Sequence, residues 1–164
     1  VCYTDEIWVR DGVRVNQCKR HRKFSGDIFA TSLQLCIVSP SSVMMRRDFF
    51  ERFGLFDPEL PACEDYDLWL RASAAIPFHF IDQPLITKRG GHQDQLSHRH
   101  WGMDRFRAKS IVKCLRNGIF NCEQRALALE VLRRKCAVLI NGAEKRGHFA
   151  QANEYRSWVE QWAD

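Results

Sequence analysis

Residues 55–71 read LFDPELPACEDYDLWLR, a loop with two prolines that runs into an apolar segment. Five carboxylates fall within eleven residues of it, at positions 57, 59, 64, 65 and 67. The apolar spacing that follows, with Pro77 as a stop, predicts a helix over about residues 64–75. Glu64 and Asp65 then lie in its first turn, where the positive end of a helix favours carboxylates.

Two interpretations of this acidic cluster stay open on spacing alone. Carboxylates on a loop that feeds a helix are candidates for proton-transfer chemistry. Alternatively, the charges serve the helix itself. Asp67 and Arg71 stand four residues apart, the spacing of a routine surface ion pair that contributes about a few tenths of a kcal/mol.

The bulk composition is that of one soluble globular protein. The 164 residues are 45% apolar and 27% charged, which is ordinary. No apolar run reaches the roughly 18 residues of a membrane span, and no signal peptide opens the chain. We therefore expect a cytoplasmic protein. The net charge of +5 suits an anionic ligand or a loose association with anionic lipid heads, but it is too mild to indicate nucleic-acid binding.

The cysteines do not form a recognisable framework. There are seven, and none stands in a C-x-x-C pair, so neither disulfides nor a four-cysteine zinc site is predicted. Cys18 and His21 have ligand-like spacing, but no second pair matches them. Reduced thiols are the expected state.

Before the acidic cluster, the patterns predict short strands and short helices. Residues 7–10 and 13–16 flank Asp11-Gly12, a dipeptide typical of a tight hairpin turn. The basic run at 19–23 indicates a solvated loop rather than a binding patch. The other expected elements are a short helix at 28–35, an extended stretch at 36–45 kinked at Pro40, and a helix from its cap Asp48 to Phe53, closed by Gly54.

After the cluster, the chain turns from extended to helical. Residues 78–87 read as a third extended segment broken by Pro84, and residues 88–97, with paired glycines, read as a loop. The last third predicts a helix closed at 117–118, a capping box at Asn121 and Gln124, and two apolar stripes, at 129–143 and 149–162, of an antiparallel helical hairpin.

Three segments together resemble the inverting family 2 glycosyltransferases: residues 54–57 (GLFD), 64–71 (EDYDLWLR) and 90–97 (GGHQDQLS). Bacterial members also read similarly from residue 3 onward, and the likeness covers about residues 1–110. It implies an α/β protein that is the C-terminal part of a GT-A fold, with a short mixed sheet and helices. Residues 1–100 would be its acceptor-side half, and residues 101–164 a helical extension.

The resemblance implies that Asp65 is the general base of an inverting sugar transfer. A sugar hydroxyl is a poor nucleophile, so a carboxylate within hydrogen-bond reach must take its proton during attack on the anomeric carbon. Glu64 would hold the acceptor or the local backbone.

The glycine-rich loop carries the next expected site residues. His92 matches a histidine that binds the metal or the diphosphate in some GT-A enzymes, and Lys88 and Arg89 would balance phosphate charge. Gly91 would help the loop to close over the donor. A surface histidine in a flexible loop is the alternative for His92. Asp94 and Gln95 would contact the sugar or cap the following turn.

Seven further residues are expected to edge the acceptor site. Asp5, Glu6 and Trp8 would lie on one side, and Ser39, Pro40, Ser41 and Ser42 on the other, where small hydroxyls leave room for a sugar. For Trp8, a purely structural role as a cross-strand partner in the hairpin is an equal alternative.

The strands that would bind the nucleotide, and the main metal-binding carboxylates of the family, are not in this sequence. We therefore expect the 164 residues to be inactive alone, although Mg²⁺ or Mn²⁺ is implied by the resemblance. The expected partners are a nucleotide-sugar donor and a glycan or lipid-linked acceptor, in bacterial envelope polysaccharide synthesis at the inner face of the membrane. The alternative is a non-catalytic scaffold module that uses the helical hairpin, and an oligomer through Trp158 and Trp162 stays open.

Overall fold

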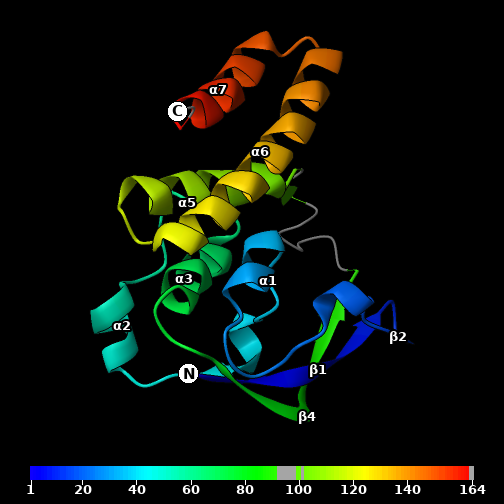
Figure 1. Cartoon of the computed structure of the whole chain (residues 1–164). Helices are drawn as coiled ribbons and strands as arrows, with labels where there is room; N and C mark the ends of the chain where they lie inside the picture. Colours follow the sequence, from blue (N-terminus) through cyan, green and yellow to red (C-terminus); the bar gives the residue numbers. More distant parts are fainter. Residues whose placement is uncertain (92–98, 101, 163–164) are drawn as a thin grey trace. The chain divides into compact units, whose positions relative to one another are not determined.

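The structure is a computed structural model that describes residues 1–91, 99–100 and 102–162. It divides into two compact units, Val1–Trp101 and Gly102–Asp164, here called the first and second unit. Across the described residues, the architecture is mixed α/β, with a small mixed sheet and three α-helices in the first unit and three further α-helices in the second (Figure 1).

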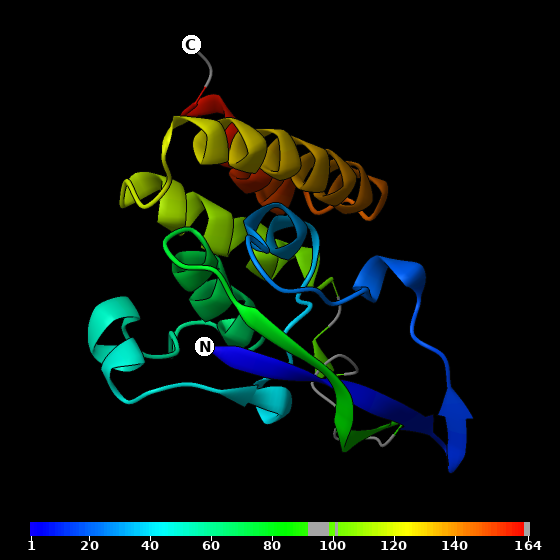
Figure 2. The ribbon, with the colours of Figure 1, turned by 60° about the horizontal axis from the view of Figure 1, so that its bottom comes forward.

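The sheet is built around β1 (Cys2–Arg10). β2 (Val13–Val15) and β3 (Val43–Met44) pair antiparallel with β1, and β4 (His79–Gly90) pairs with it in parallel. Figure 2 shows β1 and β4 crossing the lower part of the first unit side by side. The predicted hairpin is confirmed, since Asp11 and Gly12 both have positive φ, at 49° and 79°, and Arg10 pairs with Val13.

Two predictions about β4 are wrong. Pro84 does not break the strand but stands opposite Asp5 at a register irregularity, where a missing N–H is tolerated. Lys88, Arg89 and Gly90 are not in a loop, because they continue β4 beside residues 8–10 of β1.

The short α-helices lie close to the predicted positions: α1 (Phe29–Gln34), α2 (Asp48–Phe53) and α3 (Glu64–Ser73). Two 3₁₀ turns, Lys19–His21 and Pro40–Ser42, were not predicted, since these residues were expected in a loop and in an extended stretch. Gly54, with φ 76°, ends α2 as expected, and its N–H donates to the carbonyl of Phe50. The cap prediction is wrong, since Arg47 occupies the N-cap position and Asp48 is already helical.

The core of the first unit forms where α3 meets the sheet. Trp69 contacts Phe78 edge-on at 6.2 Å between ring centroids, and Phe78 contacts Tyr3 in the same manner at 6.3 Å. All three rings are at most 2% exposed. The Tyr3 hydroxyl donates to the carbonyl of Phe24 at 2.8 Å, so the loop before α1 is tied to β1. Burial of these rings fixes α3 beside the sheet, and with it the acidic cluster in its first turn.

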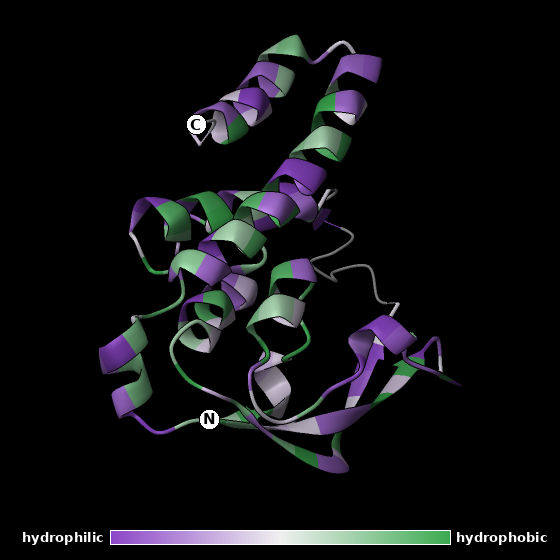
Figure 3. Ribbon diagram, in the orientation of Figure 1, coloured by the Kyte–Doolittle hydropathy of each residue, from purple (hydrophilic) through white to green (hydrophobic). Residues whose placement is uncertain are grey.

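The second unit consists of α5 (Asp104–Arg116), α6 (Cys122–Lys145) and α7 (Phe149–Glu160). The capping box at Asn121 and Gln124 is confirmed, and α6 and α7 form the expected helical hairpin. Figure 3 shows apolar and polar residues alternating along both helices, as in amphipathic helices packed on one side. Lys135 of α6 is buried and pairs with Asp104 of α5 at 2.8 Å. No described helix has the length and hydrophobicity of a membrane span.

Candidate functional site

Asp65 lies in the first turn of α3 and is held there by two donors. One carboxylate oxygen, Oδ1, accepts from the N–H of Tyr66 at 2.6 Å, and Oδ2 accepts from the thiol of Cys36 at 3.4 Å. The Tyr66 side chain is buried and donates to the carbonyl of Leu33 at 2.9 Å, which fixes this turn against α1. The half-buried Asp65 carboxylate is therefore placed on a rigid element.

The residue that leads into α3 has an unusual backbone. Cys63 adopts the left-handed conformation, with φ 64° and ψ 22°, immediately before Glu64 and Asp65. For a residue with a Cβ this conformation costs on the order of 1 kcal/mol, and such strain is concentrated at functional sites. The sharp turn at Cys63 brings both carboxylates to the start of the buried helix.

Asp67, two residues further on, has a different environment. It is 0% exposed, and its Oδ2 contacts the Arg71 guanidinium at 3.0 and 3.1 Å. Arg71 also donates to the carbonyl of Leu55 at 2.8 Å, so the pair anchors the preceding loop to α3. The prediction of a routine surface pair is wrong, because α3 is buried on the side that carries Asp67.

Replacing Asp67 by Asn is expected to lower the free energy of unfolding by about 3–5 kcal/mol, since the largely buried Arg71 loses its counter-ion. The matched control is Asp48→Asn, which removes an exposed carboxylate paired with Arg46 at 3.1 Å and should cost less than about 1 kcal/mol. Urea unfolding followed by circular dichroism compares the two. Equal, small losses in both variants would contradict the buried pair.

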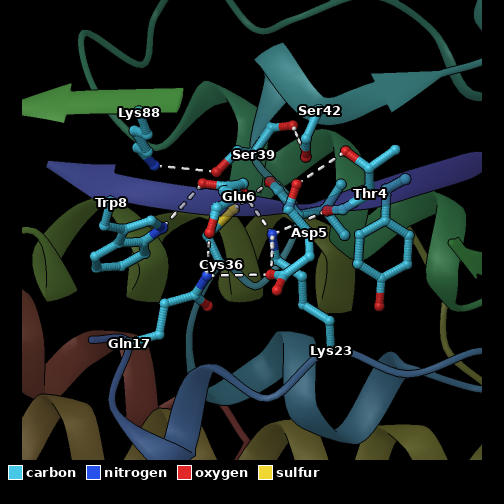
Figure 4. A network of polar contacts seen from close by, with 12 residues as sticks. Thr4, Asp5, Glu6, Trp8, Gln17, Lys23, Cys36, Ser39, Ser42 and Lys88 are labelled. Carbon is cyan, nitrogen blue, oxygen red and sulfur yellow. Dashed lines mark hydrogen bonds and ion pairs between the residues drawn. The ribbon is translucent and has the colours of Figure 1, made fainter. Parts of the chain in front are cut away.

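A second group of polar side chains gathers around β1 (Figure 4). Glu6 is 4% exposed, and its two oxygens accept from Lys23 at 2.6 Å and from the Trp8 indole N–H at 3.1 Å. The two-residue spacing of Glu6 and Trp8 places them on one face of the strand. Lys23 also donates to the carbonyl of Thr4 at 3.0 Å. Lys23 is thus buried, and the interpretation of residues 19–23 as a solvated loop is wrong at its last residue.

The charge state of Glu6 follows from these contacts. Burial alone would raise the pKa of its carboxyl group, but hydrogen bonds from Lys23 and Ser39, with the charges of Lys23 and Lys88, outweigh burial and lower the pKa overall. Lys88 completes the group, because its ammonium donates to the Ser39 hydroxyl at 3.0 Å and lies 5.5 Å from the centre of the Trp8 ring.

An open hollow of about 970 Å³ lies beside this group. Trp8 and Phe80 supply aromatic surface to its lining, and Asp5 supplies a carboxylate that is 35% exposed. The Gln17 amide donates both to Asp5 Oδ1 at 3.1 Å and to the carbonyl of Glu6 at 3.0 Å, which holds the Asp5 carboxylate in place. Aromatic rings beside fixed polar groups are a surface that suits a polyol such as a sugar. Asp65 is not among the residues that line this hollow.

The segment from Cys36 to Ser42 connects Asp65 with the group of polar side chains around β1. Cys36 contacts Asp65, Ser39 contacts Glu6 and Lys88, and the buried Ser42 donates to the carbonyl of Ser39 at 3.0 Å. Figure 4 shows Cys36, Ser39 and Ser42 in one view with Glu6.

The structure brings only some of the expected site residues together. Asp5, Glu6 and Trp8 line the hollow, and Glu64 lies half-buried beside Asp65. Of the other expected residues, Ser41 and Arg89 are exposed and Ser42 is buried. Gly91 packs against the hairpin turn at Asp11. Three more fall outside the described residues: His92, Asp94 and Gln95.

Three contributors were missed by sequence reasoning: Gln17, Lys23 and Cys36. They stand in unremarkable surroundings, and only the fold shows their partners. Within residues 1–91, 99–100 and 102–162, no group of three or more His, Cys, Asp or Glu side chains is arranged to hold a metal ion.

Comparison with known proteins gives a partial likeness to glycosyltransferases. An uncharacterized glycosyltransferase of Rickettsia conorii (strain ATCC VR-613 / Malish 7) is 32% identical over 59 residues, which are 36% of this chain and 10% of that protein. One from Rickettsia felis (strain ATCC VR-1525 / URRWXCal2) is 30% identical over 59 residues, with the same shares. The chain thus matches about a tenth of the length of these relatives. No protein-family model and no solved structure matches the chain.

Proposed function

We propose that this chain is part of a glycosyltransferase of the inverting family 2 type on a GT-A fold, with Asp65 as its general base. The partial likeness to two glycosyltransferases supports the reaction class. The observation that carries the choice of base is the carboxylate of Asp65, half-buried in the first turn of α3 and fixed by Tyr66 and Cys36.

In the proposed reaction, an acceptor hydroxyl oxygen attacks the anomeric carbon of a nucleotide sugar. Its proton passes to the Asp65 carboxylate as the new glycosidic bond forms, and the bond from the anomeric carbon to the diphosphate breaks with its electron pair. The nucleoside diphosphate leaves from the opposite face, so the configuration inverts. A rigidly held base contributes through orientation, because the attack tolerates little misplacement.

Because Asp65 does not line the hollow beside β1, we propose that the hollow holds the part of the acceptor away from the reacting hydroxyl, which itself reaches Asp65. The Trp8 ring would stack on a sugar, and Asp5 and Gln17 would hydrogen-bond its hydroxyl groups. Both oxygens of Glu6 already accept hydrogen bonds, from Lys23 and from the Trp8 indole. Glu6 would therefore hold these neighbours in place instead of contacting the acceptor itself. The remaining proposed acceptor or donor contacts are Glu64, Ser41, Ser42, Arg89, Gly91, Asp94 and Gln95.

Mg²⁺ or Mn²⁺ would neutralise the diphosphate of the donor. His92 is the residue of this chain proposed to contribute to that site. The glycan or lipid-linked acceptor, bacterial envelope synthesis and a place at the inner face of the membrane are proposed with the reaction class. The net charge of +5 is consistent with anionic partners.

Stereochemistry tests the proposal. The gene product that carries these residues is incubated with Mn²⁺ and a panel of nucleotide sugars, and release of the nucleoside diphosphate identifies the donor. Nuclear magnetic resonance of the product should then show an anomeric configuration opposite to that of the donor. A product with retained configuration would contradict a single displacement with Asp65 as base.

A second candidate function is a non-catalytic interaction module. The observation that favours it is apolar exposure on the helical hairpin, where Val138 and Phe149 are 67% and 64% exposed. Such side chains suit a protein contact. In that case the gene product binds a partner through α6 and α7 and turns over none of the nucleotide sugars.

A further inference from the structure

The contact between Cys36 and Asp65 joins two segments of the first unit. Cys36 follows α1, and its sulfur lies 3.4 Å from Asp65 Oδ2 and 3.2 Å from the carbonyl oxygen of Val38. The same segment contacts Glu6, which lines the hollow, through the side chain of Ser39. The thiol is half-buried, so its surroundings are largely fixed.

A thiol has one proton and is a weak donor. Of the Val38 carbonyl and the Asp65 carboxylate, only the carboxylate carries a negative charge, and charge-assisted hydrogen bonds are the stronger ones. If the proton turned to Val38, the sulfur lone pairs would face the carboxylate and repel it. Donation to Asp65 Oδ2 is therefore the favoured arrangement whenever Asp65 is ionised.

The two oxygens of Asp65 thereby have donors of unequal strength. The backbone N–H of Tyr66 holds Oδ1 at 2.6 Å, while the weaker S–H donor holds Oδ2. Together they fix the plane of the carboxylate. A carboxylate oxygen can accept more than one hydrogen bond, so Oδ2 can also accept from an acceptor hydroxyl.

We infer that Cys36 is a positioning residue for Asp65, whose thiol orients Oδ2 as the oxygen that takes the proton of the acceptor hydroxyl. This inference rests on the proposed role of Asp65. The contact between Cys36 and Asp65 can be tested without measuring turnover. Failure of the Cys36 inference can therefore be distinguished from failure of the proposed role of Asp65 as general base.

The first experiment measures alkylation of Cys36 by iodoacetamide in the folded chain at one fixed pH, with each cysteine quantified by mass spectrometry. In Asp65→Asn, Cys36 should react about five-fold faster or more, because the reactive thiolate no longer forms beside a negative charge. Cys18 and Cys122 are exposed and should react equally in both proteins. Cys136 should stay unreactive in both, because burial raises its pKa to about 11. An unchanged rate at Cys36 would overturn the inference.

The second experiment uses the gene product with the donor identified by nucleoside diphosphate release. Cys36→Ala should lower kcat about ten-fold, the effect of one lost hydrogen bond and a loosened base, while both KM values change less than about two-fold. Cys36→Ser retains a donor and should restore kcat to within about three-fold of the parent. Raised KM values in the alanine variant, or no rescue by serine, would mean that the thiol only supports packing. Full turnover by Asp65→Asn would instead refute the proposed base and leave the alkylation result standing.

Discussion

Asp65→Asn is expected to lower the rate of sugar transfer by between about 100-fold and about 10,000-fold, while folding and donor affinity stay close to those of the parent protein. Asparagine has the same shape, and its side-chain oxygen can still accept from the N–H of Tyr66. It cannot take a proton from the acceptor hydroxyl. The loss should therefore fall on kcat, measured as nucleoside diphosphate released under saturating donor and acceptor.

Three other carboxylates of the first unit provide controls for this variant. Asp48→Asn makes the same charge change at an exposed position of α2 and should leave kcat unchanged. Asp67→Asn removes a negative charge two residues from Asp65. It should lower stability instead of kcat, since Asp67 is paired with Arg71. Glu64→Gln, beside the proposed base, should raise the KM of the acceptor more than it lowers kcat.

Two outcomes would contradict the assignment of Asp65. Turnover at the parental rate in a folded Asp65→Asn protein would show that the proton goes elsewhere. A loss of unfolding free energy comparable to that of Asp67→Asn would show that Asp65 is a structural carboxylate at the start of α3. Thermal unfolding of the two variants under identical conditions separates these cases.

The elements that the sequence predicts well are those whose signals are local. The Asp11-Gly12 turn requires positive φ at both residues, and this pair favours that backbone whatever surrounds it. The α3 helix is confirmed because its apolar spacing and its stop at Pro77 lie within one short window. The capping box at Asn121 depends only on residues three apart.

The errors lie where distant segments decide the outcome. Lys88 to Gly90 form a strand because residues 8–10 of β1, some eighty positions earlier, supply their hydrogen-bond partners. Spacing could not show whether the Asp67–Arg71 pair is exposed, since a pair four residues apart looks the same on either side of a helix. Lys23 resembles the neighbouring basic residues in sequence, and only the fold places it against Glu6.

The candidate site shows the same division. Asp5, Glu6 and Trp8 are close in sequence and follow one strand, so a likeness over residues 3–8 was enough to select them together. Gln17 fixes Asp5 from a different segment, and neither its residue type nor its spacing indicates that contact. Which side chains complete a site is set by tertiary packing, which a pattern within one segment does not encode.

Glu6→Gln is expected to destabilise the first unit by about 3 kcal/mol near neutral pH, because it leaves the buried ammonium of Lys23 without its closest counter-ion. The side chains of Lys23 and Glu6 are 4% and 1% exposed, so water cannot replace the lost charge. Asp5 is 3.7 Å from the ammonium and more exposed, which makes it a weaker substitute. Urea unfolding followed by tryptophan fluorescence measures the difference.

The pH dependence of this difference follows from the lowered pKa of Glu6. A carboxyl group whose pKa in the folded protein lies below its ordinary value of 4.5 stabilises the fold fully above 4.5. That stabilisation is lost as the pH falls through the lower, folded-state pKa, since the folded protein must then bind a proton it holds poorly. The gap between parent and Glu6→Gln should therefore be largest near neutral pH and shrink steadily once the pH drops below 4.5.

A double variant isolates the ion pair from the packing around it. When Lys23→Met is added to Glu6→Gln, no buried charge is left unpaired, and the glutamine oxygen can still accept from the Trp8 indole. Replacing both ions of a buried pair is often nearly neutral, so the double variant should recover a large part of the lost stability. A double variant as unstable as Glu6→Gln, or a stability gap independent of pH, would mean that Glu6 contributes by shape and not by charge.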